Sequence, residues 1–143
     1  MPQTQMDTYM GNMPMLDPDT MLLKDLAATL RTLTKTANYT CTVNDSGTIF
    51  NSTGAEAGVT FTLPTPAAAN DGCFYGFVST SATGIAVSCA DSIVYDNSIV
   101  VDSLTAETED HIIGAALFVV SNGSKWLIFA AKNALAVFTA AAA

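Results

Sequence analysis

His111 is the only histidine of this sequence and its only side chain with an ordinary pKa near neutrality. Glu109 and Asp110 directly precede it, so a nearby serine would complete a nucleophilic triad. However, no G-x-S-x-G motif is present to expose a serine at a sharp turn. His111 lies where an acidic segment meets an apolar one, which is an ordinary place for a polar boundary residue. We therefore expect a structural role for His111 and predict that the protein is not an enzyme.

Carboxylates offer a second route to chemistry, because paired Asp or Glu side chains hydrolyse glycosides. Asp91 with Asp96, and the carboxylates of residues 107–110, are the candidates. The single tryptophan, Trp126, lies in an apolar segment, where packing in a core or an interface is expected rather than sugar stacking. Residues 91–102 contain Asp and Asn side chains, but their spacing is not that of a calcium-binding EF-hand loop. We expect no catalytic residue and no cofactor.

The three cysteines, Cys41, Cys73 and Cys89, form no C-x-x-C pair. With one histidine in the chain, a structural zinc site with four nitrogen and sulfur ligands is not expected. An odd number of cysteines also argues against a disulfide framework. Each cysteine lies in an apolar or strand-like segment, so we expect small buried side chains in a protein assembled in a reducing cytoplasm.

The charge distribution limits the partners of this protein. The formal net charge is −8, and no Lys or Arg occurs between Lys35 and Lys125. A long segment without cations cannot displace the counterions of a nucleic acid, so we expect no nucleic-acid binding. The acidic side chains are expected to form a solvated surface that keeps an apolar protein in solution.

The chain is unusually apolar, with 50% hydrophobic residues and a mean hydropathy of +0.35. Its longest apolar run, residues 112–120, is interrupted by Gly114 and is far shorter than the roughly 20 residues of a membrane span. Residues 1–19 lack the basic and apolar regions of a signal peptide. We therefore predict no membrane association, and we expect a core and a subunit interface to bury the apolar surface.

Residues 1–16 contain five of the six methionines among Pro and Gly, without any period. Methionine adapts to irregular apolar surfaces, so this segment is either an arm that docks onto a partner chain or a disordered terminus. Asp17-Pro18-Asp19 then opens a predicted helix, and Leu22, Leu26, Leu30 and Leu33 follow on one of its faces. Threonines weaken the helix, which is expected to give way to a strand by about Thr34. The candidate contacts with a partner chain or with other subunits are Met6, Tyr9, Met10, Met13, Met15, Leu22, Leu26 and Leu30.

After residue 37 the pattern changes to short strands separated by turn signals. Strands are predicted at 39–43, 48–50, 59–63, 73–79, 83–89, 92–95, 98–101, 112–121, 125–131 and 134–139. Residues 67–72 suit a short turn of helix, residues 104–110 an acidic loop, and Asn122-Gly123 a hairpin turn. The prediction is a mainly β, antiparallel sandwich or barrel-like domain (β-tulip-like or jelly-roll-like) at 37–143. It is preceded by an extended N-terminal arm and a short α-helix at 1–36.

Six short runs resemble a β module of tailed-phage structural proteins. They are SGTIFN at 46–51, GVTFTLP at 58–64, GCFYGFV at 72–78, DSI at 91–93, IGAAL at 113–117 and VVSNGSKW at 119–126. The resemblance covers about residues 38–131 and is closest to capsid decoration (cement) proteins. It implies a β-sandwich or β-tulip-like domain that assembles, often as a trimer, on the outside of a phage head and clamps neighbouring major capsid subunits. The chain departs from this pattern at 133–138, which lead into an alanine tail instead of an aromatic strand.

These inferences combine into one expected function and one alternative. The expected protein is a structural virion component that binds the major capsid protein as a homotrimer on the outer capsid surface, after assembly in the host cytoplasm. The alternative is a head-fibre or tail-fibre adhesin module that binds host surface glycans, which would require exposed aromatic side chains.

Overall fold

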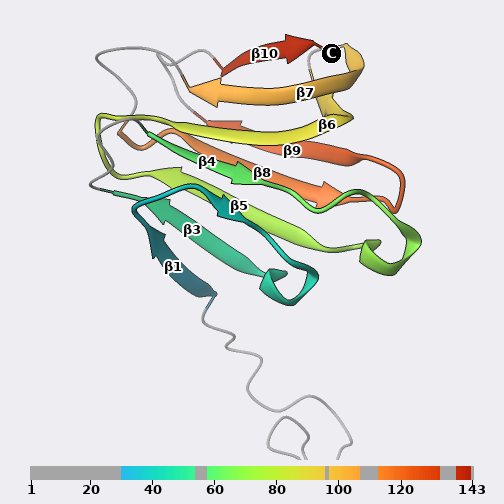
Figure 1. Ribbon diagram of the computed structural model, residues 1–143, viewed down its shortest axis with the longest axis horizontal. Coiled ribbons are helices and arrows are strands. Elements are labelled where there is room, and N and C mark those ends of the chain that lie inside the picture. The colour runs from blue at the N-terminus through green and yellow to red at the C-terminus, as the bar shows by residue number, and fades with distance from the viewer. Residues whose placement is uncertain (1–29, 54–57, 96, 107–112, 133–137, 143) are drawn as a thin grey trace, which may run out of the picture.

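The computed structural model describes residues 30–53, 58–95, 97–106, 113–132 and 138–142. Ten strands form one mixed sheet, and two short 3-10 helices, η1 (Val43–Asp45) and η2 (Ala68–Asn70), lie between strands. The strands are β1 (Arg31–Lys35), β2 (Tyr39–Thr40), β3 (Thr48–Ser52), β4 (Val59–Thr62), β5 (Phe74–Ser79), β6 (Ile85–Tyr95), β7 (Ser98–Ala106), β8 (Ala116–Ser121), β9 (Trp126–Lys132) and β10 (Phe138–Ala142). Figure 1 shows them running side by side, from β1 at the bottom of the view to β10 at the top.

The first six strands alternate between two parallel stacks. Strands β1, β3 and β5 pair in parallel in one stack, and strands β2, β4 and β6 pair in parallel in the other. Parallel neighbours require a crossover connection, and here the strand in the opposite stack provides it. The chain therefore winds in successive turns, each of which adds one strand to each stack.

A hairpin joins the two stacks. Strand β8 pairs antiparallel with β5, and β9 pairs antiparallel with β8 and parallel with the second half of β6. Strands β7 and β10 extend the sheet antiparallel beyond β6. We call β1, β3, β5, β8 and β9 the first layer, and β2, β4, β6, β7 and β10 the second layer.

The core lies between the two layers and is rich in aromatic side chains. Phe50 on β3 lies 5.4 Å from Phe61 on β4, between ring centroids, and Phe61 lies 4.9 Å from Phe77 on β5. Tyr75 and Trp126 continue the cluster with centroids 5.3 Å apart. All five side chains are fully buried, so aromatic packing holds the layers together.

The structure confirms the predicted mainly β domain, but the strand directions are mixed. Five of the nine described strand pairings are parallel, whereas the sequence pattern predicts an antiparallel sheet. Turn signals set where strands end, but they do not reveal that the next strand crosses to the other layer. The alternation predicted at 59–63 is confirmed, with Val59, Phe61 and Leu63 buried. The turn of helix within 67–72 and the hairpin around Asn122-Gly123 are also confirmed.

Several element boundaries differ from the predictions. The apolar spacing predicts Leu33 on the face of a helix, but it lies in strand β1 and packs against the core, so the sheet begins before residue 37. Residues 43–45 form a 3-10 turn rather than the end of a strand, and residues 104–106 continue β7 rather than opening a loop. Of the strand predicted at 134–139, residues 138–139 begin β10, and residues 134–137 lie outside the described residues. Tertiary pairing overrides weak local propensity in each case.

Candidate functional site

One of the eight candidate contact residues lies in the described part of the chain. Leu30 immediately precedes β1, and its side chain is 54% exposed. The other seven, Met6, Tyr9, Met10, Met13, Met15, Leu22 and Leu26, lie outside the described residues, as does His111. The structure therefore defines the point at which the predicted N-terminal segment joins the sheet, and this junction is the candidate site.

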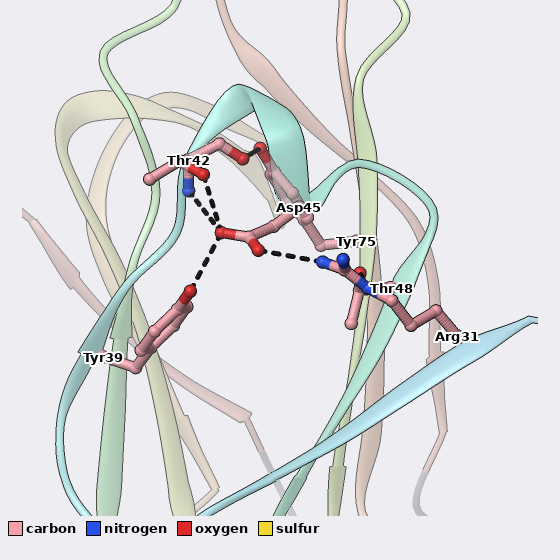
Figure 2. Close-up of polar contacts among 6 residues, drawn as sticks. All are labelled: Arg31, Tyr39, Thr42, Asp45, Thr48 and Tyr75. Atoms are coloured by element: carbon pink, nitrogen blue, oxygen red, sulfur yellow. Dashed lines mark hydrogen bonds and ion pairs between the residues drawn. The ribbon is translucent and has the colours of Figure 1, made fainter.

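Arg31, the first residue of β1, is held by two residues of the next turn of chain. Its Nη2 atom donates to Oδ1 of Asp45 over 2.9 Å, and its Nε atom donates to the hydroxyl of Thr48 over 2.9 Å (Figure 2). Asp45 and Thr48 are both buried, whereas about half of the Arg31 side chain is exposed. The guanidinium group thus bridges solvent and a buried carboxylate at the start of the sheet.

The second oxygen of Asp45 accepts three further hydrogen bonds. The donors are the Tyr39 hydroxyl at 3.1 Å and the backbone N–H and hydroxyl of Thr42, each at 2.9 Å. Figure 2 shows these groups converging on the one carboxylate from β1, β2 and η1. Burial by itself would raise the pKa of Asp45, but the Thr42 and Tyr39 hydrogen bonds and the Arg31 charge outweigh it, so its pKa lies below the ordinary value.

The second cation of β1 is also tied to the body. The ammonium group of Lys35 lies 3.5 Å from the centroid of the Tyr39 ring, which is a cation–π contact. Tyr39 in turn packs against Phe50 of the core, with ring centroids 5.3 Å apart. Both ends of β1 are therefore anchored through charged side chains, and five residue pairs link β1 to β3 between them.

Two described thiols and the Tyr75 phenol have pKa values shifted away from the ionised form that acts as a nucleophile. Burial raises the pKa of the Cys41 thiol to about 12, and it also raises the pKa of Cys89 and of the Tyr75 hydroxyl. A nucleophilic cysteine requires the opposite shift, towards the thiolate. Across the described residues, no group of three or more His, Cys, Asp or Glu side chains is arranged to hold a metal ion.

A cavity of about 280 Å³ lies between the ends of β4, β6 and β7. Its lining is Gly58, Val59, Thr60, Thr83, Gly84, Ile85, Ala86, Thr105 and Ala106. Among the described residues of this lining, three threonine hydroxyls are the only side-chain polar groups, and none of these residues carries the carboxylate, imidazole or thiol of a general acid or base. The described lining also has no aromatic ring on which a sugar could stack.

Trp126, for which the sequence predicts packing in the core or in an interface, is fully buried. Its indole N–H donates to the carbonyl of Pro64 over 2.9 Å. A buried ring satisfied by a backbone carbonyl is not available as a glycan platform, which weakens the adhesin alternative.

The sequence pattern marks Asp45-Ser46-Gly47 only as a turn and misses the role of the aspartate. A signal exists in the spacing of Thr42 and Asp45, which matches a capping box at the start of a helical turn. The spacing of Thr42 and Asp45 gives no indication that Arg31 and Tyr39 approach Asp45 from other strands. The contacts that anchor β1 are therefore visible only in the folded structure, where successive turns of the chain lie against one another.

No protein-family model matches the chain, and no curated protein matches it significantly. Among the described residues, no helix is long and apolar enough to cross a membrane.

Proposed function

We propose that this protein is a structural virion component that binds the outer surface of a phage head and cements neighbouring major capsid subunits as a homotrimer. It acts by binding, without catalysis and without a cofactor. Residues 1–30 reach onto neighbouring subunits, and the sheet is the body from which they extend. The proposal rests on the chain's sequence features and on the anchoring of β1.

The observation that supports it best is the double attachment of β1. A segment that clamps two subunits transmits force to the body from which it emerges, so its root must not peel away. Arg31 is tied to a buried carboxylate and Lys35 to an aromatic ring. An ion pair between two exposed side chains would contribute little, but the Asp45 carboxylate is buried and accepts four hydrogen bonds.

A second line of support comes from how the polar groups of the body are used. The buried Asp45 and Asn70 side chains each hold a turn of the backbone. The described thiols with shifted pKa values are held in their neutral form by burial. These features suit a rigid scaffold better than a reactive centre.

The test uses capsids assembled without this protein and the full chain carrying Met10→Asp and Met13→Asp. The matched control carries Gln3→Asp and Gln5→Asp, which adds the same charge to the same segment at polar positions. We expect the methionine variant to lose at least tenfold in affinity for capsids in a co-sedimentation assay, and the glutamine variant to bind like the wild type. Deletion of residues 1–16 should also weaken binding while leaving the circular dichroism of the β body unchanged.

Equal binding by the wild type and the methionine variant would remove the arm from the proposal. Failure of the wild-type protein to bind any capsid, together with tight selective binding on a glycan array, would replace the cement function by the adhesin alternative.

A further inference from the structure

The outer face of the second layer has the residue types expected of a sheet face that is exposed to solvent. Along β4, residues 85–88 of β6 and residues 103–106 of β7, the residues that point away from the core are small or carry hydroxyl groups. Thr60 and Thr105 flank Ala86 in one row, and Thr62 and Ser103 flank Ser88 in the next. This is the ordinary pattern of an antiparallel or mixed sheet with one face on the core and the other in water.

The outer face of the first layer is different. Across β5, β8 and β9, the residues that alternate with the buried ones are almost all large and apolar. We call the following six side chains, which are half-buried or exposed, the apolar outer face: Phe74, Val78, Phe118, Val120, Leu127 and Phe129. The two layers belong to the same sheet and enclose the same core. The different residue types on their outer faces therefore reflect what each face contacts.

The centre of the apolar outer face is formed by closely packed side chains. The rings of Phe118 and Phe129 pack together with centroids 5.8 Å apart, although Phe129 remains 57% exposed. Gly76 lies beneath them, and a Cβ atom at this position would come within 2.7 Å of the Phe118 ring and 3.2 Å of the Ile49 side chain. Because residue 76 has no side chain, the Phe118 and Ile49 side chains can pack directly over the backbone of β5.

Charge identifies the partner that suits this face. The chain has a net charge of −8, so two copies repel each other wherever their carboxylates approach within a Debye length, about 10 Å at 0.1 M salt. Strands β5, β8 and β9 contain no Asp or Glu, whereas Asp91 and Asp102 lie on β6 and β7 of the other layer. Contact through the apolar outer face therefore brings together strands that carry no carboxylate.

We propose that the apolar outer face is the surface through which copies of this chain associate. A second copy brings the same aromatic and aliphatic side chains and no carboxylate on these strands, and burial of the two faces removes apolar area from water at about 25 cal/mol per Å². In a closed oligomer these faces surround the symmetry axis and leave the hydroxyl-rich faces towards solvent. This inference adds a subunit interface to the proposed function. It rests on that proposal only for the number of copies in the oligomer.

The test measures the mass of the full chain by size-exclusion chromatography with light scattering. We expect the wild type to elute as a multiple of the 14.9 kDa chain, and Phe129→Glu and Phe74→Glu each to elute as a 14.9 kDa monomer. These two side chains are 57% and 39% exposed, so the substitutions are compatible with the folded chain. Val100→Glu is the matched control, because Val100 is 44% exposed on β7 of the other layer and its variant should keep the wild-type mass.

Circular dichroism and thermal melting of each variant establish that the monomers are folded, and capsid co-sedimentation is read separately on the same samples. A monomeric wild type, or a Phe129→Glu variant with the wild-type mass, would overturn the inference whatever the capsid result. If Phe129→Glu keeps the wild-type mass but loses capsid binding, the face contacts the capsid instead and the inference is also wrong. An oligomeric wild type that dissociates on Phe129→Glu but binds no capsid would support the inference and count against the cement function alone.

Discussion

Asp45 and Asn70 occupy the same structural position in two successive turns of the chain. Each is the third residue of a 3-10 turn, and its side-chain oxygen accepts the N–H of the residue three positions earlier, Thr42 or Ala67, over 2.9 Å. A glycine with positive φ follows each of them two residues later. The two turns are therefore copies of one device for returning the chain from the second layer to the first.

The two residues differ in charge because their surroundings differ. Asp45 faces only donors, including Arg31. Asn70 accepts from the hydroxyl of Ser121 over 3.0 Å, but its Nδ2 atom donates to the carbonyl of Thr65 over 2.8 Å. A carboxylate satisfies the first environment, and only an amide satisfies the second.

Exchange of these side chains should therefore destabilise the fold in both directions. We expect Asp45→Asn to place an amide N–H₂ group against other donors, and Asn70→Asp to place a carboxylate oxygen against the Thr65 carbonyl. Each change should lower the free energy of unfolding by about 1–3 kcal/mol, measured by urea denaturation. The control is Asp71→Asn at the exposed neighbouring position, which should change stability by less than about 0.5 kcal/mol.

The lowered pKa of Asp45 predicts an acid-sensitive fold. In the unfolded chain this carboxyl titrates near an ordinary aspartate value of about 3.9, so below that pH the unfolded state binds more protons than the folded state. The Asp45 contribution is therefore complete above about pH 4 and is lost as the pH falls through its folded-state pKa. Urea titrations between about pH 2 and pH 6 should show a steeper loss of stability in the wild type than in Asp45→Asn. Parallel curves would mean that other carboxylates determine acid unfolding.

Gly76 should be intolerant of a side chain because of Phe118. We expect Gly76→Ala to cost about 1–3 kcal/mol of unfolding free energy, since the new methyl group overlaps the Phe118 ring. In a Phe118→Ala background the same change should cost less by about 0.5 kcal/mol or more, which a double-mutant cycle measures.

Gly72→Ala is the control for that cycle. A Cβ atom at residue 72 meets nothing within 4 Å, but the φ of +78° disfavours any side chain. Its cost, about 1 kcal/mol, should be the same with Phe118 present or removed. An equal cost of Gly76→Ala in both backgrounds would contradict crowding by the Phe118 ring.

The single Trp126 provides an optical test of the core. Because its ring is fully buried and its N–H is bonded to Pro64, we expect blue-shifted emission and weak quenching by acrylamide in the folded protein. Emission should shift to the red and quenching should rise together on unfolding in urea. Strong quenching in the native protein, or an emission shift on adding glycans, would instead place the ring at an accessible surface.

Much of the fold could be predicted from the sequence because local patterns are strong where one strand face is buried. The alternation from Val59 to Leu63 and the Asn122-Gly123 hairpin are examples. The parallel order of the strands could not be predicted in this way, since it depends on which strand lies beside which, and a period of two residues is the same in either direction. Leu33 shows a further limit of sequence-based prediction. Its spacing from other leucines fits a helix, but it lies in strand β1 and packs against the core.

The site was less accessible to sequence reasoning than the fold. Arg31, Tyr39 and Asp45 lie far enough apart in the chain that no motif spacing links them, and only the stacking of turns brings them together. The repeated 3-10 turn at Asp45 and Asn70 is visible in the sequence as two similar tripeptides, Asp45-Ser46-Gly47 and Asn70-Asp71-Gly72. Comparing those turns with each other would have revealed the internal repeat.

The winding of the chain has a consequence for how such a domain changes in size. Each turn adds one strand to both layers and ends in a return bend that docks onto the strand of the next turn, as when the N–H of Gly47 donates to the carbonyl of Phe74. A whole turn can therefore be gained or lost at the β1–β2 edge without repacking the β8–β9 hairpin, which pairs with β5 and β6, or reversing any strand. The height of the domain therefore changes in steps of one strand spacing, about 4.8 Å. Half a turn would leave one layer a strand shorter than the other.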